Sequence, residues 1–503
     1  MKRITALLLL LCTLSATAQN QKAQAYADNL CQPSRGDIGT AVWGILAKDG
    51  NGKVLVSLNP DMQLTPASNM KLITTGCALH SLGKDYRFGT SIAYTGEIKD
   101  GILEGDIYIV GGGDPTLASA DSIALKPDAL FWKWKSAMRE AGINAIHGRI
   151  IGDGRFFEGN LENSSWEYDD MGTDYGTGGN GLSFYENAQD FDVSAGPTVG
   201  SPVNVQMKYP ETPWMHFIFR GTTGPDGAGN SLYMYTTDLA PYAEMRGVFG
   251  IDRKPKTENF SNKFGAMTCA YYFWKNLTAT GWVITGGYAD IDRGGYIRGA
   301  DFVPTDKAAD EMKTLTTSWS PTLELIARET NHRSDNFYAE TLLRTMGKQA
   351  TGTDLYDSCY VAEKEVLEDL KVDTSRGIQI EDGSGLSRHN FISPDFFVRY
   401  LTAMESSPAF PTFLKSLPQP GSNGTLRSVL SGKPETLKKR IWMKSGSMDG
   451  VLCYSGYIMP VGYVPGQPVP KDAIVFSILS NNCMAPVSEV RACIMEIITR
   501  LAE

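Results

Sequence analysis

The sequence predicts an α/β (α+β) protein in which a sheet built from both ends of the chain is covered by helices. Three observations favour this fold. A β-hairpin and a helix stand near the N-terminus, and a group of strands and a helix stand at the C-terminus. Residues 89–300 between them are rich in glycine, aromatic residues and short β-like runs. With 503 residues, the chain is long enough for about three domains.

The first eighteen residues have the pattern of a secretory signal peptide. Lys2 and Arg3 precede the apolar run 4–14, and residues 16–18 are small residues of the kind found at a cleavage site. We therefore predict an exported protein, cleaved near Ala18 and located in the periplasm. No later apolar stretch is long enough to cross a membrane, so we expect no transmembrane segment.

Composition excludes several functional classes. The hydrophobic fraction of 42% and charged fraction of 20% describe a globular protein. Removal of Lys2 and Arg3 would change the formal net charge from −9 to −11, which disfavours nucleic acid as a partner. Five scattered histidines predict no metal site, and the chain has neither a Walker A motif nor a GxSxG elbow. Residues 176–181 match GxGxxG but do not follow a strand, so they predict a flexible loop and no cofactor.

The cysteines predict no disulfide framework. Seven lie outside the predicted signal peptide, an odd number, and none forms a CxxC pair. One bridge remains possible in an exported chain, but the spacing does not select its two cysteines.

The N-terminal half of the sheet is predicted from a hairpin. Strand-like residues 40–46 and 54–58 flank the turn signal Asp49–Gly52. A helix beginning near Pro66 follows directly. It carries Ser68 and Lys71, whose spacing of three places both side chains on one helical face. A serine hydroxyl becomes a nucleophile when a base takes its proton, and lysine can be that base if burial keeps it neutral.

A second Ser-x-x-Lys sequence, Ser81 to Lys84, is interpreted as structural. It lies where this helix is expected to end, with Gly83 as a C-terminal cap and Lys84 near the negative end of the helix dipole.

The rest of the chain continues the pattern. A helix over residues 128–141 is the clearest in the middle region, and helical periodicity returns near Thr322, with a helix opening at Ser334 as its N-cap. The C-terminal strands and final helix are predicted over residues 440–444, 451–459, 473–480 and 486–501.

Three short motifs suggest the chemistry. They are Ser68-x-x-Lys71, Ser334-Asp335-Asn336 and Lys444-Ser445-Gly446. Each is common by itself, but their joint occurrence, in this order and on these elements, is typical of penicillin-binding proteins and β-lactamases. Serine at 445, in place of the usual threonine, keeps the hydroxyl.

The motifs predict a serine acyl transfer. Ser68 attacks a carbonyl with Lys71 as proton acceptor, and Ser334 relays a proton to the leaving amine. Asn336 holds the substrate amide, while Lys444 holds its carboxylate. The backbone N–H groups of Ser68 and Ser447 are expected to form the oxyanion hole.

The chain resembles the class C low-molecular-mass penicillin-binding proteins, the D-alanyl-D-alanine carboxypeptidase/endopeptidase family. The resemblance rests on the three motifs and on four further stretches, residues 105–117, 334–343, 381–388 and 424–427. It implies a penicillin-binding transpeptidase/β-lactamase-like sheet covered by helices, with two mostly β domains inserted between the SxxK and SxN motifs. The expected division is 1–18 signal peptide, 19–88 and 301–503 catalytic domain, 89–200 and 261–300 inserted domain, and 201–260 second inserted domain.

The resemblance also implies substrates and contacts. Relatives act on peptidoglycan peptides ending in D-Ala-D-Ala and are acylated by β-lactams. Ser445 and Gly446 would then contact substrate, and an acidic residue of the insertion would pair with the free end of diaminopimelate. Asp170 is the best match, although Asp169 fits the spacing almost as well. Arg388 and Met448 would line the same pocket.

Two alternatives remain at this point, a serine β-lactamase and a catalytically idle cell-wall binding protein. The sequence contains no Glu-x-x-Leu-Asn segment of the kind class A β-lactamases use for deacylation. It does not distinguish carboxypeptidase from endopeptidase action, because the two differ only in the amine that leaves, and it indicates no oligomeric state.

Overall fold

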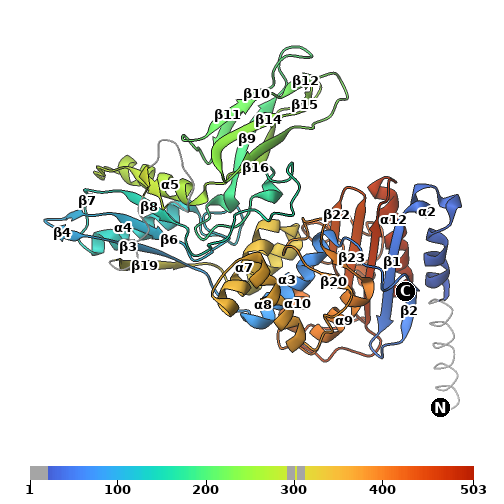
Figure 1. The fold of residues 1–503 in the computed structure, drawn as a ribbon. Coiled ribbons are helices and arrows are strands. Elements are labelled where there is room, and N and C mark those ends of the chain that lie inside the picture. Colours follow the sequence, from blue (N-terminus) through green and yellow to red (C-terminus); the bar gives the residue numbers. More distant parts are fainter. Residues whose placement is uncertain (1–20, 292–300, 303–311) are drawn as a thin grey trace. The chain divides into compact units, whose positions relative to one another are not determined.

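A computed structural model describes residues 21–291, 301–302 and 312–503 (Figure 1). The described chain forms two compact units. The first comprises the described parts of Met1–Asp85, Leu323–Met346 and Tyr360–Glu503, and the second comprises those of Tyr86–Thr322 and Gly347–Cys359. The predicted signal peptide lies outside the described residues.

The first unit contains a five-stranded antiparallel sheet that joins the two ends of the chain (Figure 1). The N-terminal hairpin pairs with the C-terminal strands, since Val42 lies opposite Asn481 and Asp49 opposite Ile474. This sheet confirms the predicted fold class. In spatial order its strands are β2 (Val54–Leu58), β1 (Val42–Asp49), β24 (Ile474–Asn481), β23 (Val451–Ile458) and β22 (Ile441–Met448).

Helices cover both faces of this sheet. Alternate residues of β1, including Trp43 and Ile45, share one buried core with helical residues 21–30 and with the apolar face of α12. Gly44, between them, faces Pro394 at the start of α9. The helices of this unit, two of which extend into Gly347–Cys359, are α2 (Asp37–Thr40), α3 (Met70–Ser81), α6 (Leu323–Glu329), α7 (Asn336–Thr351), α8 (Tyr356–Asp369), α9 (Pro394–Met404), α10 (Phe410–Ser416), α11 (Glu435–Lys438) and α12 (Val487–Ala502).

Smaller elements join these helices. They are the 3₁₀ turns η1 (Pro33–Arg35) and η2 (Ala67–Asn69), the π-helical segment η6 (Thr330–Ser334), and the short strands β20 (Ile378–Gln379) and β21 (Phe391–Ile392).

Gly76 allows α3 to lie directly against α9. A Cβ atom at this position would be 1.9 Å from the hydroxyl oxygen of Tyr400, which is fully buried and donates to the carbonyl of Leu72. We expect Gly76→Ala to lower the free energy of unfolding by about 1–3 kcal/mol, because a buried overlap of this kind forces a shift in packing. Denaturant unfolding would measure the loss. It should be smaller in a Tyr400→Phe background, which lacks the clashing oxygen, and an equal loss in both backgrounds would contradict the explanation.

The second unit is organised around a six-stranded mixed sheet. Its edge strand β19 pairs antiparallel with β3, so residues 313–319 belong to this unit. The boundary predicted at residue 301 therefore differs from the division into units, in which the second unit extends to Thr322. Residues 313–319 complete the inserted sheet before the chain re-enters the first unit. The strands are, in spatial order, β18 (Asp301–Phe302), β17 (Tyr288–Asp290), β8 (Ile150–Asp153), β6 (Ile107–Val110), β3 (Gly89–Tyr94) and β19 (Lys313–Trp319).

Two helices and several smaller sheets complete the second unit. Helix α4 (Pro127–Glu140) matches the predicted helix, and α5 (Gly265–Ala279) packs against β8 and β17. The 3₁₀ turns are η3 (Asp174–Gly176) and η4 (Tyr185–Asn187). The remaining strands are β4 (Glu97–Lys99), β5 (Ile102–Glu104), β7 (Ala145–Ile146), β9 (Ala188–Ser194), β10 (Asn204–Tyr209), β11 (His216–Phe219), β12 (Thr222–Gly224), β13 (Tyr233–Thr237), β14 (Ala240–Arg246), β15 (Val248–Gly250) and β16 (Lys256–Ser261).

The glycine-rich segment 176–181 is packed rather than exposed. Four of its six residues are glycine, the other two are Thr177 and Asn180, and all six are buried. Lys263 donates to the carbonyl oxygen of Gly176 at 2.6 Å, and Asn187 donates to that of Gly178 at 3.0 Å. The predicted flexible loop is therefore a fixed connection, because buried side chains satisfy its backbone carbonyls.

Two global features complete the description. Cys31, Cys77, Cys269, Cys359, Cys453, Cys483 and Cys493 are all free thiols. Within the described ranges, none of the helices combines the length and the hydrophobicity that a membrane-spanning helix requires.

Candidate active site

Ser68 lies in the tight turn that leads into α3. The preceding residue, Ala67, has a left-handed backbone with φ +46°, which is uncommon for a residue with a side chain. The buried amide of Asn69 anchors the turn to the sheet by donating to Ser455 on β23 at 2.8 Å. Lys71 follows in the first turn of α3. The turn and the helix thus direct the serine hydroxyl and the lysine amine toward each other.

The amine of Lys71 is fully buried and has three oxygen partners. Its Nζ lies 3.0 Å from Ser68 Oγ, 2.6 Å from Asn336 Oδ1 and 2.6 Å from the carbonyl oxygen of Ser384. The amide and carbonyl oxygens can only accept. A neutral amine would donate its two hydrogens to them and direct its lone pair at the hydroxyl of Ser68. This geometry suits proton transfer from the serine.

Burial also favours the neutral amine. Loss of solvation lowers the pKa of Lys71 from 10.5 to about 8, and the negative charges of Asp382, Glu340 and Asp335 oppose that shift. At pH 7 roughly one tenth of the protein would carry the free base, a fraction that rises with pH.

Ser334 lies opposite Lys444. It ends η6 with a left-handed backbone, φ +61°, and its Oγ is 2.9 Å from Lys444 Nζ. The prediction that Ser334 caps α7 is wrong, since Asp335 accepts the bond from the Tyr338 backbone N–H that an N-cap makes. The serine side chain is therefore turned away from the helix. Unusual backbone angles of this kind are often found at functional sites.

Lys444 is a second fully buried amine. Burial and, secondarily, the nearby Lys71 hold its pKa well below the ordinary value. Its Nζ also donates to the carbonyl oxygen of Ser445 at 2.7 Å. The two lysines, on α3 and β22, thus lie in one cluster with Ser68, Ser334 and Asn336.

Gly446 brings strand β22 against the turn that carries Ser68. A Cβ atom there would be 2.6 Å from the Pro66 carbonyl oxygen and 2.9 Å from the Ser68 nitrogen, so a larger residue would separate the two segments. Ser447 is next on the strand, and its side chain is exposed. Ser445 Oγ lies 3.2 Å from Thr425 Oγ1. Met448 is partly buried at the end of the strand.

Residues behind Lys71 hold its amine in a way that the sequence does not predict. Within the run 381–388, the carbonyl oxygen of Ser384 accepts from the lysine amine. Glu340 accepts from the Ser384 backbone N–H at 2.7 Å, and Asp382 accepts from that of Gly385 at 2.7 Å. The Asp-Gly-Ser-Gly sequence is itself a turn signal, but a backbone carbonyl leaves no trace of its target in the sequence.

The second Ser-x-x-Lys sequence is structural, as predicted. Ser81 donates to the carbonyl of Cys77 within α3, and Lys84 pairs with neighbouring Asp85 at the surface. Gly83 takes the left-handed conformation, φ +84°, that ends the helix.

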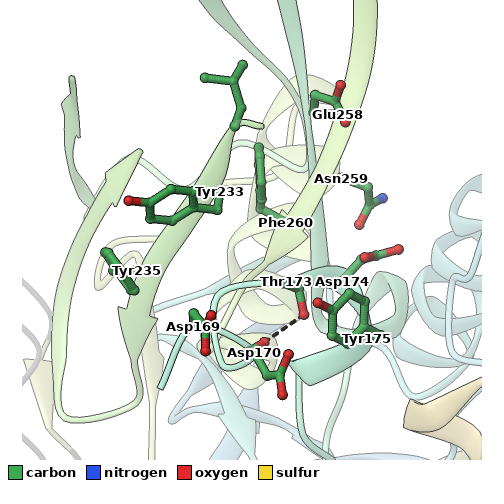
Figure 2. Close-up of a pocket in the computed structure, with 11 residues that line it drawn as sticks. Asp169, Asp170, Thr173, Asp174, Tyr175, Tyr233, Tyr235, Glu258, Asn259 and Phe260 are labelled. Atoms are coloured by element: carbon green, nitrogen blue, oxygen red, sulfur yellow. Dashed lines mark hydrogen bonds between the residues drawn. The ribbon is translucent and has the colours of Figure 1, made fainter. Parts of the chain in front are cut away.

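The predicted recognition residues lie in different units. Asp169 and Asp170 line a cavity of about 530 Å³ within the second unit, and Thr173 donates to the Asp170 carbonyl oxygen at 2.6 Å (Figure 2). Arg388 is in the first unit, where it donates to the carbonyl of Asp449 at 3.2 Å. The other side chains that line the cavity are Thr173, Asp174, Tyr175, Leu232, Tyr233, Tyr235, Glu258, Asn259 and Phe260. Four carboxyl groups give it an electrostatic preference for cations.

Comparison with known proteins identifies the family. Residues 23–501 match the D-Ala-D-Ala carboxypeptidase 3 (S13) family. The chain belongs to this family. It is 29% identical over 464 residues to a D-alanyl-D-alanine carboxypeptidase from Actinomadura sp. (strain R39), a match covering 89% of this chain and 79% of that protein.

Solved structures show the same fold. Penicillin-binding protein 4 from Haemophilus influenzae matches with a TM-score of 0.74 at 19% identity, over 92% of this chain and 95% of that one. The same protein complexed with a β-lactam matches with a TM-score of 0.69 at 19% identity and the same coverage. The predicted resemblance to class C penicillin-binding proteins and the predicted enzyme class, a serine-type D-Ala-D-Ala carboxypeptidase, are therefore confirmed.

Proposed function

We propose that this S13 protein is a serine D-Ala-D-Ala carboxypeptidase/endopeptidase that acts on peptidoglycan stem peptides and cross-links through an acyl-enzyme at Ser68. The observation that carries the proposal is the 3.0 Å contact between Ser68 Oγ and the buried amine of Lys71. Asn336 Oδ1 and the Ser384 carbonyl oxygen take the two hydrogens of the neutral amine, so its lone pair is available to accept the proton of Ser68.

In the proposed acylation, Ser68 Oγ attacks the carbonyl carbon of the penultimate D-alanine while Lys71 takes the hydroxyl proton. The backbone N–H groups of Ser68 and Ser447 stabilise the oxyanion. The C–N bond then breaks, and the amine leaves with a proton delivered through Ser334. Water next attacks the ester, which releases the shortened peptide and restores the Ser68 hydroxyl.

The remaining motif residues hold the substrate in this proposal. Lys444, supported by Ser445 and Gly446, binds the terminal carboxylate, and Asn336 binds the substrate amide. Binding of a carboxylate would favour the charged form of the Lys444 amine, which burial alone disfavours. β-Lactams would acylate Ser68 by the same route and remain attached.

We assign recognition of the free end of diaminopimelate to Asp170 in the second unit, and we keep Arg388 and Met448 of the first unit as separately predicted substrate contacts. The four carboxyl groups around the cavity support a cationic ligand group there. Asp169 lines the same cavity, and comparing Asp170→Asn with Asp169→Asn would distinguish the two.

Two further assignments accompany the function. The insertion would consist of two domains, with residues 201–260 forming the smaller one. Residues 1–18 would direct export to the periplasm and be removed near Ala18.

Mass spectrometry of the products tests the function. Purified protein should release D-alanine from a muropeptide pentapeptide, convert cross-linked dimers to monomers, and give a long-lived penicilloyl adduct on the intact protein. Rapid turnover of penicillin without action on muropeptides would indicate a β-lactamase instead. If the protein forms no adduct and shortens no peptide, only a cell-wall binding role remains.

A further inference from the structure

The turn Asp382–Gly385 holds the amine of Lys71 through a backbone carbonyl. Its Ser384 carbonyl accepts from the lysine amine, and the Ser384 N–H donates to Glu340 on α7. On the other side, Thr74 Oγ of α3 donates to the Gly383 carbonyl oxygen at 2.7 Å. A Cβ atom at Gly383 would lie 2.9 Å from Leu343 Cβ, so the turn is pressed closely against α7. Its position sets the position of the Ser384 carbonyl, and thereby that of the amine.

Behind Thr74 lies a buried carboxyl group that the proposed mechanism does not use. Glu363 on α8 is 0% exposed, and neither of its oxygens has a hydrogen-bond partner in bonding geometry among the described residues. The hydroxyl of Thr74 on α3 faces it. An ionised carboxylate in this position would be strongly unfavourable, because burial without a partner removes its solvation.

The groups around Glu363 reinforce this conclusion. From α7 and from the turn it faces the carboxyl groups of Glu340 and Asp382, and from α3 and α9 it faces the thiol of Cys77 and the hydroxyl of Tyr400. Arg344 is also buried on α7, one turn beyond Glu340. Burial, and then the two neighbouring carboxyl groups, raise the pKa of Glu363 from 4.5 to about 8. The group therefore carries a proton at neutral pH.

The direction of the hydrogen bonds indicates what the proton on Glu363 does. The hydroxyl of Thr74 has one hydrogen, which it donates to the Gly383 carbonyl oxygen. Toward Glu363 the same hydroxyl can therefore only accept. The two side chains face each other without a hydrogen bond in bonding geometry. A protonated Glu363 has the hydrogen that this contact lacks, and would complete a chain in which the carboxyl donates to Thr74 and Thr74 donates to the turn. An ionised Glu363 would instead compete with Gly383 for the Thr74 hydrogen and release the turn.

We propose that Glu363 is a positioning residue that, in its protonated form, acts through Thr74 to hold the Asp382–Gly385 turn and with it the amine of Lys71. This inference rests on the proposed acylation of Ser68. Glu363 does not touch substrate, and its protonation state decides whether the proton acceptor is held in place.

The pH dependence of acylation tests the proposal. We would measure the rate of labelling by fluorescent penicillin between pH 6 and pH 10 for the wild type, Glu363→Gln and Thr74→Val. The wild-type rate should rise as Lys71 loses its proton and fall again as Glu363 ionises, giving a bell. Glutamine donates an N–H at every pH, so Glu363→Gln should match the wild type within about threefold at pH 7 and exceed it by about tenfold at pH 9.5.

Thr74→Val removes the intermediate hydroxyl. It should slow acylation by about tenfold at all pH values, and adding Glu363→Gln to it should no longer restore the alkaline rate. The matched control is Thr345→Val, since Thr345 is an equally buried helical threonine whose hydroxyl, in the part of the chain that the structure describes, bonds only to the Thr341 carbonyl of its own helix. Its profile should follow that of the wild type.

Thermal unfolding measured as a function of pH would test two further points, that the Glu363→Gln variant folds and that Glu363 changes its protonation state. Because the pKa of Glu363 is higher in the folded chain than in the unfolded chain, the folded state keeps a proton that the unfolded state has lost. Wild-type stability should therefore fall relative to Glu363→Gln as pH rises from 4.5 to about 8 and change no further above that.

The outcomes are separable. If the acylation rates of the wild type and Glu363→Gln fall identically above pH 8, the positioning role is overturned. It is also overturned if Glu363→Gln slows acylation by the same factor at every pH. A wild-type protein that forms no penicilloyl adduct at any pH would overturn the proposed function itself.

Discussion

Replacing Ser68 by alanine is expected to abolish both the penicilloyl adduct and D-alanine release. The serine oxygen is the atom that forms the acyl bond in the proposed reaction, and the other groups around Lys71 cannot replace it. We expect a loss of at least about 10⁴-fold in the acylation rate, the scale on which removal of a serine nucleophile acts. Intact-protein mass spectrometry after exposure to penicillin measures it.

The chain provides its own control for this experiment. Ser81 belongs to the second Ser-x-x-Lys sequence, and within the described residues its hydroxyl bonds only to the Cys77 carbonyl one turn earlier. Ser81→Ala should label as the wild type does. Full labelling of Ser68→Ala would remove the basis of the assignment.

Replacing Lys71 by methionine is expected to slow acylation by about 10²–10⁴-fold, the usual contribution of a general base. Methionine fills the buried space but cannot take the Ser68 proton. The residual rate should also lose its rise with pH around 8, because the group responsible, whose pKa burial lowers to about 8, is gone. Labelling rates measured between pH 6 and pH 8, on the rising side of the expected bell, would show both effects.

Lys84→Met is the matched control, since Lys84 is more than half exposed and pairs only with Asp85 among the charged groups of the described chain. It should leave the rate and its pH dependence unchanged. If Lys71→Met keeps the rise between pH 6 and pH 8, another group serves as the base.

Much of the first unit could be predicted because its signals are local. The turn sequence Asp49–Gly52 between two β runs specifies the hairpin, and the closely spaced C-terminal runs specify the remaining strands. The motif residues Ser68, Lys71 and Lys444 were located by their types and order, and the structure brings them together. Their catalytic roles stay predictions that the variants above test.

What the sequence did not predict depends on tertiary contacts. Helix α5 is buried on most of its sides and rich in aromatic residues, so its composition resembles that of a strand. Strand β19 is fixed by its partner β3, more than 200 residues earlier. Ser334 looked like an N-cap, but Lys444 holds its hydroxyl and Asp335 takes over the cap.

The central pairing of β1 with β24 also affects how the enzyme is made. Asp49 finds its partner Ile474 about 420 residues later, so a ribosome adding 5–20 residues per second needs roughly 20–90 s between the two. During that interval the hairpin β1–β2 has an unpaired edge, whereas the inserted unit can already fold from its own strands. Ser68, the proposed nucleophile, therefore meets Lys444 only when synthesis is nearly complete, and a chain truncated before residue 441 would lack Lys444 and the strand that carries it.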